Sequence, residues 1–291
     1  MLRPQNCALP WSLPAALVAA ATAVSLSMPT ASYAQTDYYN TDRGRPIQIE
    51  DAYATERKAF ELKLAPVRLQ RTTGSAYSWS LQPEIAYGIL PRTQIELSAP
   101  LSYRESGTEH RTGLTGLEFS VFHNFNVETA TVPALALRAD ILAPIGNLAT
   151  QHVYSTLTAI GTRTYRWARF HVNGQYTFGS APTSRFSEPN AGVEFGDLDA
   201  SRWLAGIAVD KTYPLQSTLV TAEFFGRKPI TFANVTSPTE YTAGTGIRFQ
   251  LNPTLALDGG IGRHLNGAEQ GWYVTFGSAY AFSIKSLFPD N

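Results

Sequence analysis

Alternation of apolar and polar side chains is the dominant pattern of this chain from residue 60 onward. In the segment Gly271–Ser283, large apolar residues such as Trp272, Val274 and Phe276 stand at every second position, with small or polar residues between them. Successive side chains of a β-strand point to opposite faces, so the pattern predicts a strand with one apolar face. A soluble sheet would bury that face, whereas a membrane barrel exposes it to lipid.

The same alternation recurs in segments close to the length of about 9–11 residues that a tilted transmembrane strand needs. Twelve such segments can be marked: Phe60–Leu69, Tyr77–Gly88, Thr93–Tyr103, Gly113–Val127, Ala134–Ile145, Val153–Tyr165, Arg169–Gly179, Arg202–Tyr213, Thr218–Gly226, Tyr241–Leu251, Leu255–His264 and Gly271–Ser283.

The connections between these segments alternate in length. Connections after even-numbered segments are short, such as Leu90–Arg92 and Arg166–Ala168, whereas those after odd-numbered segments are mostly longer, such as Arg104–Thr112 and Ser180–Ser201. Short turns on one rim and long polar loops on the other are typical of outer-membrane barrels. We therefore predict an all-β fold, a closed antiparallel transmembrane barrel of about twelve strands over residues 60–283. The last strand should pair with the first and remove the final sheet edge.

The regions outside the predicted barrel have different characters. Residues 1–34 predict a signal peptide, with a short apolar run after Arg3 and small residues at the positions read by signal peptidase, so we expect cleavage after Ala34. Residues 35–59 predict a periplasmic lead-in. Its second half, from Ile47, has modest helical character with Asp51 as a possible cap, which leaves open a loose segment or a short helix at or inside the barrel mouth. Residues 284–291 form a C-terminal tail.

Composition agrees with a barrel that has one wet and one oily face. Charged residues make up 16% of the chain and aromatic residues 12%, and no apolar run of about 20 residues follows the leader. The single cysteine, Cys7, lies in the leader, so the mature chain has no disulfide and no cysteine-ligated metal. Removal of the leader takes away Arg3 and no acidic residue, so the formal net charge falls from 0 to −1. No basic stripe is available for nucleic acid.

Charged residues of both signs collect on the face opposite the apolar one. A lipid-facing Arg or Lys at mid-depth costs about 2–4 kcal/mol, so we expect these side chains to face the lumen. They give either a polar channel or an ion-pair network that fills a narrow barrel. The candidate lumen-lining residues are Glu84, Glu96, Glu118, Arg138, Asp140, Asp210, Glu223, Arg248 and Asp258.

The sequence predicts no catalytic, cofactor-binding or metal-binding residues. Its five histidines are scattered, without a metal-ligand spacing. None is followed by a serine two positions later, the arrangement that barrel lipases use on their lipid face. Asn173 does follow His171 at that spacing, but both fall on the lumenal face. The loop Ser180–Ser201 could fold inward as a constriction, cover the surface as a lid, or stay exposed.

The sequence carries two resemblances to known families. Thr275–Phe282, with Gly277, Tyr280 and Phe282 in the sequence TFGSAYAF, resembles the C-terminal signal of outer-membrane barrels, which implies recognition by the barrel-assembly machinery. The segments Ile49–Ala52, Glu61–Val67 and Leu81–Leu101 resemble the outer-membrane family labelled "MetA pathway of phenol degradation". That resemblance implies a pore for small solutes, aromatic or hydrophobic ones among them.

The function predicted from the sequence is passive transport of small solutes across a bacterial outer membrane, with lipid and solute as partners. The alternatives are a non-conducting barrel that anchors or scaffolds at the envelope and, less favoured, a lipid-modifying enzyme.

Overall fold

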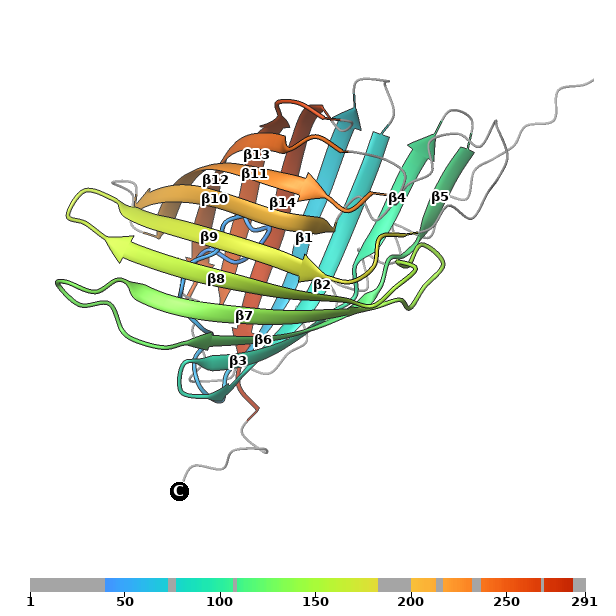
Figure 1. The fold of residues 1–291 in the computed structure, drawn as a ribbon. Helices are drawn as coiled ribbons and strands as arrows, with labels where there is room; N and C mark the ends of the chain where they lie inside the picture. The colour runs from blue at the N-terminus through green and yellow to red at the C-terminus, as the bar shows by residue number, and fades with distance from the viewer. Residues whose placement is uncertain are drawn as a thin grey trace, which may run out of the picture.

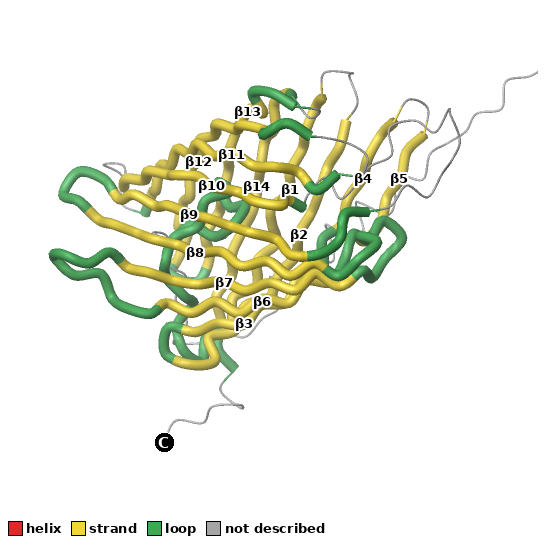
Figure 2. Tube along the Cα trace, viewed as in Figure 1, coloured by secondary structure: helices red, strands yellow, loops and turns green. Residues whose placement is uncertain are grey.

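A computed structural model shows that the protein is an antiparallel β-barrel. The structure describes residues 40–72, 77–106, 109–182, 200–212, 217–231, 237–267 and 270–284. The predicted signal peptide, most of the loop 180–201 and all but the start of the C-terminal tail lie outside the described residues. No helix in the described part of the chain is long and apolar enough to cross a membrane, and Figure 2 shows only strands and loops there.

The sheet contains fourteen strand segments. Their bounds are β1 Phe60–Thr72, β2 Tyr77–Leu90, β3 Thr93–Ser98, β4 Leu101–Ser106, β5 Glu109–Leu114, β6 Leu117–Asn124, β7 Ala134–Ala143, β8 Tyr154–Thr164, β9 Arg169–Phe178, β10 Ser201–Thr212, β11 Thr218–Pro229, β12 Glu240–Asn252, β13 Leu255–His264 and β14 Gly271–Phe282.

Two pairs of segments are halves of single wall strands, so the barrel has twelve strands, as predicted. β3 and β4 both pair with β2, one after the other, and are separated by Ala99 and Pro100. β6 pairs with β3 and β5 with β4, with a break at Thr115 and Gly116. Proline has no backbone N–H to give to the ladder, which explains the first break.

The barrel closes between its first and last strands, which confirms the predicted closure. β1 pairs on one side with β2 and on the other with β14, where Phe60 lies opposite Phe282 and Thr72 opposite Gly271. Figure 1 shows the strands tilted around a common interior, with the β4–β5 hairpin extending beyond the neighbouring strands.

Some connections differ in length from the sequence prediction. Most of Arg104–Thr112, expected as a long loop, forms the β4–β5 hairpin, in which Glu105 pairs with His110. These residues are polar on both faces, so alternation cannot mark them as strand, yet their backbones still pair. Conversely, β6 ends at Asn124, and the connection to β7 is longer than the expected Glu128–Val132.

The two faces of the wall differ as a barrel requires. Apolar side chains such as Ile207 and Phe276 are 57% and 55% exposed on the outside. Inward residues such as Thr275 and His171 are buried and polar. A twelve-stranded barrel is wider than the roughly eight-stranded size that wall side chains can fill. Something other than the wall must therefore bury these inner side chains.

An aromatic stack crosses the seam of the barrel. The Phe60 ring lies 4.5 Å from Tyr87 and 5.5 Å from Phe282, measured between ring centroids. Each aromatic pair contributes about 0.5–1.5 kcal/mol beyond area burial. Phe60→Ala should therefore lower the unfolding free energy by about 1–3 kcal/mol from the pairs alone. Urea titration, read by heat-modifiable migration on a gel, measures this.

The matched control for that substitution is Phe224→Ala. Phe224 stacks only on Tyr241, at 6.0 Å, among the aromatic pairs of the described residues. A Phe60→Ala midpoint no lower than that of Phe224→Ala would show that the seam stack adds nothing.

Candidate functional site

Residues 40–59, which we call the lumen segment, lie inside the barrel. In Figure 1 this segment is the blue chain between the strands. It contacts side chains from strands all around the wall, including β6, β8, β11 and β14. It joins β1 beside Gly88, whose backbone N–H donates to Ala59 O at 3.0 Å. The lumen segment is therefore what fills the space that wall side chains leave.

The lumen segment is not the short helix that its composition suggests. No helical turn forms in residues 40–59, and the segment is extended and bent. Asp51 is not a helix cap: its Oδ2 accepts a hydrogen bond from Thr41 N at 3.0 Å, and its own N–H donates to Thr41 O. Wall side chains bind the N–H groups of Ile49 and Ala52, which competes with helical hydrogen bonds.

Apolar contacts help to hold the lumen segment. Ile47 and Ile49 pack with wall residues of β10 and β11 in a buried cluster that includes Leu204 and Phe225. Ala52 packs in a second buried cluster with Phe122, Ala134, Ala136 and Ile160. Ile49 and Ala52 are completely buried, and full burial of an isoleucine side chain stabilises by about 1.5–3 kcal/mol.

Small residues of the wall make room for the bend of the segment. Gly246 and Gly260 lie opposite each other on β12 and β13. A Cβ atom on Gly246 would lie 2.6 Å from Pro46 Cβ, and one on Gly260 would lie 2.5 Å from Pro46 O. Because any side chain there would collide with the segment, these glycines form a notch for Pro46. The glycines are thus needed for a close approach and not only for curvature.

A cluster of charges centred on Arg138 connects the lumen segment to one side of the wall. Arg138 Nη1 lies 3.2 Å from Glu50 of the segment, and its Nε lies 2.9 Å from Asp140. Arg138 also binds Glu96. From the segment, Arg43 reaches Asp140 at 3.2 Å. Except for the partly exposed Arg43, these groups are nearly inaccessible to solvent, so each buried charge depends on its partners to offset desolvation.

Lys63 of β1 forms a second cluster next to the first. Its Nζ lies 3.0 Å from Asp42 of the lumen segment, 2.8 Å from Glu84 and 3.3 Å from Glu96. One wall cation therefore serves three carboxylates, only one of which belongs to the segment.

A third cluster, on β12 and β13, repeats this arrangement. Arg248 lies 3.1 Å from Asp42 and 3.2 Å from Asp258. Arg45 of the segment reaches the same Asp258 at 3.2 Å. Removal of the segment would therefore take one partner from each wall residue and leave Arg248 and Asp258 paired only with each other.

A fourth cluster joins Asp51 to β9 and β10. Arg169 lies 3.4 Å from Asp51 and 2.8 Å from Asp210. His171 Nε2 lies 2.7 Å from Asp210, and His171 Nδ1 lies 2.9 Å from Thr162 Oγ1.

The Asp210–His171–Thr162 chain ends on the lumen segment. Thr162 Oγ1 accepts a hydrogen bond from Ala52 N at 2.9 Å. With Nε2–H donating to Asp210, His171 Nδ1 accepts the Thr162 hydroxyl proton, which fixes the neutral tautomer of the ring. Thr162 and His171 are fully buried. This order of groups resembles a hydrolytic triad, but in the described state it binds the segment and offers no access to a substrate.

The nine candidate lumen-lining residues all take part in these contacts. Six contact the lumen segment directly: Glu118, Arg138, Asp140, Glu223, Arg248 and Asp258. Glu84, Glu96 and Asp210 are one step removed, since they bind Lys63, Arg138 or Arg169.

Sequence reasoning missed the partners of these wall charges. The lumen segment supplies Asp42, Arg43, Arg45, Glu50 and Asp51. The available signal was the density of charge between residues 42 and 51, which is unusual for a loose lead-in in a chain with few charges.

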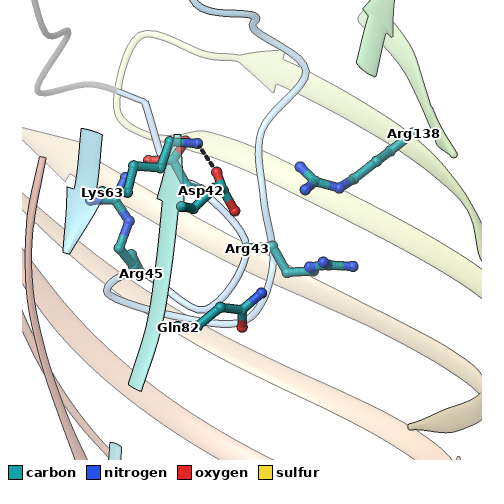
Figure 3. A pocket seen from close by; sticks show the side chains of 7 residues that line it. Asp42, Arg43, Arg45, Lys63, Gln82 and Arg138 are labelled. Carbon is teal, nitrogen blue, oxygen red and sulfur yellow. Dashed lines mark hydrogen bonds and ion pairs between the residues drawn. The ribbon is translucent and has the colours of Figure 1, made fainter. Parts of the chain in front are cut away.

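A small polar cavity remains where the Arg138 and Lys63 clusters meet the lumen segment. The space left for water in it is only about 10 Å³, room for roughly one water molecule, and Figure 3 shows the side chains around it. Its lining residues are Asp42, Arg43, Arg45, Lys63, Gln82, Glu84 and Arg138. Among the described residues, no group of three His, Asp or Glu side chains is placed to hold a metal ion.

Burial makes Glu50 a proton-binding group. Burial raises the pKa of Glu50 from 4.5 to about 7, with Glu96 and Asp140 adding to the rise and Arg138 and Arg43 opposing it. One carboxylate oxygen of Glu50 is buried without a hydrogen-bond partner. A proton on the carboxyl group would reduce this penalty.

Asp51 behaves in the same way. Burial raises the pKa of Asp51 from 3.8 to about 8, and the nearby Asp42 and Asp210 carboxylates raise it further. Arg169 and the N–H of Thr41 oppose the rise.

Docking of the lumen segment should therefore weaken as pH rises. The docked segment binds protons on Glu50 and Asp51 more tightly than the free segment, so docking is favoured at pH 5 and disfavoured as both groups ionise towards pH 8. Burial opposes ionisation of Asp42 too, but Lys63, Arg45 and Arg248 hold the pKa of Asp42 well below 3.8. The stabilisation of the docked segment by ionised Asp42 is therefore lost only in stronger acid.

The expected result is an open fraction in planar bilayers that rises at least about tenfold from pH 5 to pH 8. Glu50→Gln with Asp51→Asn should flatten this profile. An open fraction that falls from pH 5 to pH 8 would contradict the claim that docking of the segment is favoured by protons on Glu50 and Asp51.

Comparison with known proteins supports the fold. No protein-family model matches the chain, and no curated protein matches it. A solved outer membrane channel from Pseudomonas putida F1 is similar with a TM-score of 0.54 at 13% identity, covering 80% of this chain and 98% of that one. The chain has the fold of an outer-membrane β-barrel.

Two other solved barrels are similar at lower scores. A KdgM porin has a TM-score of 0.47 at 10% identity, covering 77% of this chain and 99% of that one. Outer membrane phospholipase A from Escherichia coli has a TM-score of 0.40 at 10% identity, covering 82% of this chain and 98% of that one. The specific phenol-degradation label is not confirmed by these comparisons.

Proposed function

We propose that this protein is a bacterial outer-membrane channel for passive movement of small solutes, closed in the described state by the lumen segment. The observation that carries the proposal is the polar inner wall of a twelve-stranded barrel, whose charges are satisfied by a segment that is not part of the wall. A segment held by side-chain contacts can leave without disrupting the strand pairing. A solved protein of similar fold is named an outer membrane channel, which agrees with this role.

The wall exposed by release of the segment would be polar and rich in carboxylates. Acidic side chains on it outnumber basic ones in the clusters described above, so the lumen suits neutral polar or cationic small solutes better than anions. The sequence resemblance points instead to aromatic or hydrophobic solutes. Liposome swelling with a panel of sugars, amines and aromatic acids separates these classes.

The main alternative is a non-conducting barrel that anchors or scaffolds at the envelope. The filled lumen favours this alternative if the segment never leaves. Purified full-length protein in planar bilayers distinguishes the two: the channel gives stepwise conductance, at least when docking of the segment is weakened, whereas the scaffold gives none under any condition.

The enzyme alternative is tested separately. Hydrolysis of phospholipid by the purified protein, lost on His171→Ala, would replace the channel proposal with a lipid-modifying activity. Absence of hydrolysis in both the closed and the opened protein is the result that the proposal predicts.

A further inference from the structure

The wall recognises the main chain of the lumen segment, in addition to its side chains. Glu223 Oε2 accepts hydrogen bonds from both Gln48 N, at 2.7 Å, and Ile49 N, at 3.1 Å. Thr162 accepts from Ala52 N at 2.9 Å. One carboxylate that receives two successive N–H groups is a contact that does not depend on which residues carry them.

Main-chain carbonyl groups of the segment are bound in the same way. Asn124 Nδ2 donates to Ala52 O at 2.6 Å. Asn173 Nδ2 donates to Glu50 O at 3.2 Å, and Thr275 Oγ1 donates to Pro46 O at 3.2 Å. The donors come from β6, β9 and β14, so they surround an extended chain. Binding through main-chain hydrogen bonds, with pockets for a few side chains, is how proteins recognise extended peptides.

The side-chain pockets add a charge pattern to this recognition. At the start of the segment Asp42 meets the wall cations Lys63 and Arg248. The basic residues that follow it meet carboxylates, as Arg45 meets Asp258. Acidic residues further along meet arginines, as Asp51 meets Arg169. Between them, Ile49 fills an apolar pocket.

From these contacts we infer that the lumen is a binding site for extended peptides in which an acidic residue is followed by basic ones and then by further acidic ones, and that residues 40–55 occupy this site as a tethered ligand. The inference rests on the proposed channel, because a peptide from outside reaches the site only when the tethered segment has left. It assigns a ligand class to the lumen and makes the open channel susceptible to block by peptide.

The test uses the full-length chain with Ile49→Asp. This substitution weakens docking of the segment but does not alter any wall side chain that binds a main chain in the lumen. Conductance of this variant is recorded in planar bilayers before and after addition of a synthetic peptide of residues 40–55, NTDRGRPIQIEDAYAT. The control peptide has the same composition in scrambled order. A third peptide keeps the four charged residues from Arg43 to Asp51 and both isoleucines, with alanine at Gln48, Tyr53 and Thr55.

The expected result is at least about tenfold loss of conductance with the native peptide, and a change below about twofold with the scrambled one. The alanine-substituted peptide should block within about threefold of the native peptide, because main-chain contacts are unchanged. Addition of Asn173→Ala and Thr162→Val to the channel should weaken block at least about tenfold.

The two proposals fail in different ways. If the Ile49→Asp protein migrates as a folded, heat-modifiable barrel but does not conduct, the channel function is wrong. If it conducts and neither native nor alanine-substituted peptide blocks it more than the scrambled one, the peptide site is wrong and the channel stands.

Discussion

Ile49→Asp should convert the closed barrel into an open one, with conductance in planar bilayers at least about tenfold above that of the unaltered protein. Ile49 is completely buried among Ile47, Leu204, Ala208 and Phe225. The substitution forfeits about 1.5–3 kcal/mol of apolar burial, and an unpaired carboxylate in this cluster adds a desolvation cost of several kcal/mol. Since about 1.4 kcal/mol corresponds to a tenfold change in an equilibrium constant, the equilibrium constant for docking of the segment should fall by orders of magnitude.

The matched control is Ile49→Val. It removes one methylene group, which typically costs about 0.5–1.5 kcal/mol, and it introduces no charge. This variant should stay closed. If Ile49→Asp is folded by heat-modifiable migration and as silent as Ile49→Val, the segment either remains in place or is not what closes the lumen.

The fold could be predicted from the sequence because its determinants are local and repeated. Alternation of apolar and polar residues fixes which side chains face lipid. An error in the predicted limits of one strand does not change the predicted twelve-stranded barrel. Closure between Phe60–Thr72 and Gly271–Phe282 follows from the same pattern, because any other arrangement leaves an apolar edge strand in the membrane. The limits of single strands were harder to place: β4 and β5 continue through polar residues such as Arg111, which alternation cannot distinguish from a loop.

The lumen segment could not be predicted because its conformation depends on non-local contacts. Glu50 and Asp51 have a sequence that fits a helix, and their positions are fixed by Arg138 and Arg169, each more than 80 residues away in the chain. The two interpretations of the wall charges, a polar channel or an ion-pair network, were left open for the same reason. The structure contains a network, and five of its members, Asp42, Arg43, Arg45, Glu50 and Asp51, belong to a segment outside the wall.

A reversible covalent lock tests the movement of the segment. Ala52 and Thr162 are both fully buried, and Ala52 N donates to Thr162 Oγ1 at 2.9 Å. That bond keeps the two Cα atoms within reach of the range of about 4.4–6.8 Å that a disulfide spans. The predicted mature chain has no cysteine, because Cys7 lies in the leader, so an introduced pair has no competitor.

Ala52→Cys with Thr162→Cys should therefore make a channel that opens only when reduced. Oxidation ties the segment to β8 and holds it in the lumen, whereas reduction leaves two thiols that lack the original Thr162 hydrogen bond and release the segment more readily. Each single cysteine variant serves as a control and should respond neither to oxidant nor to reductant.

The most direct measurement is single-channel recording of this double variant at pH 8, first oxidised and then with reductant added to the same bilayer. We expect a silent membrane that begins to show conductance steps, at least about tenfold above the oxidised baseline, once the disulfide is cleaved. Equal conductance before and after reduction, with the disulfide verified by thiol labelling, would show that residues 40–59 do not close this barrel.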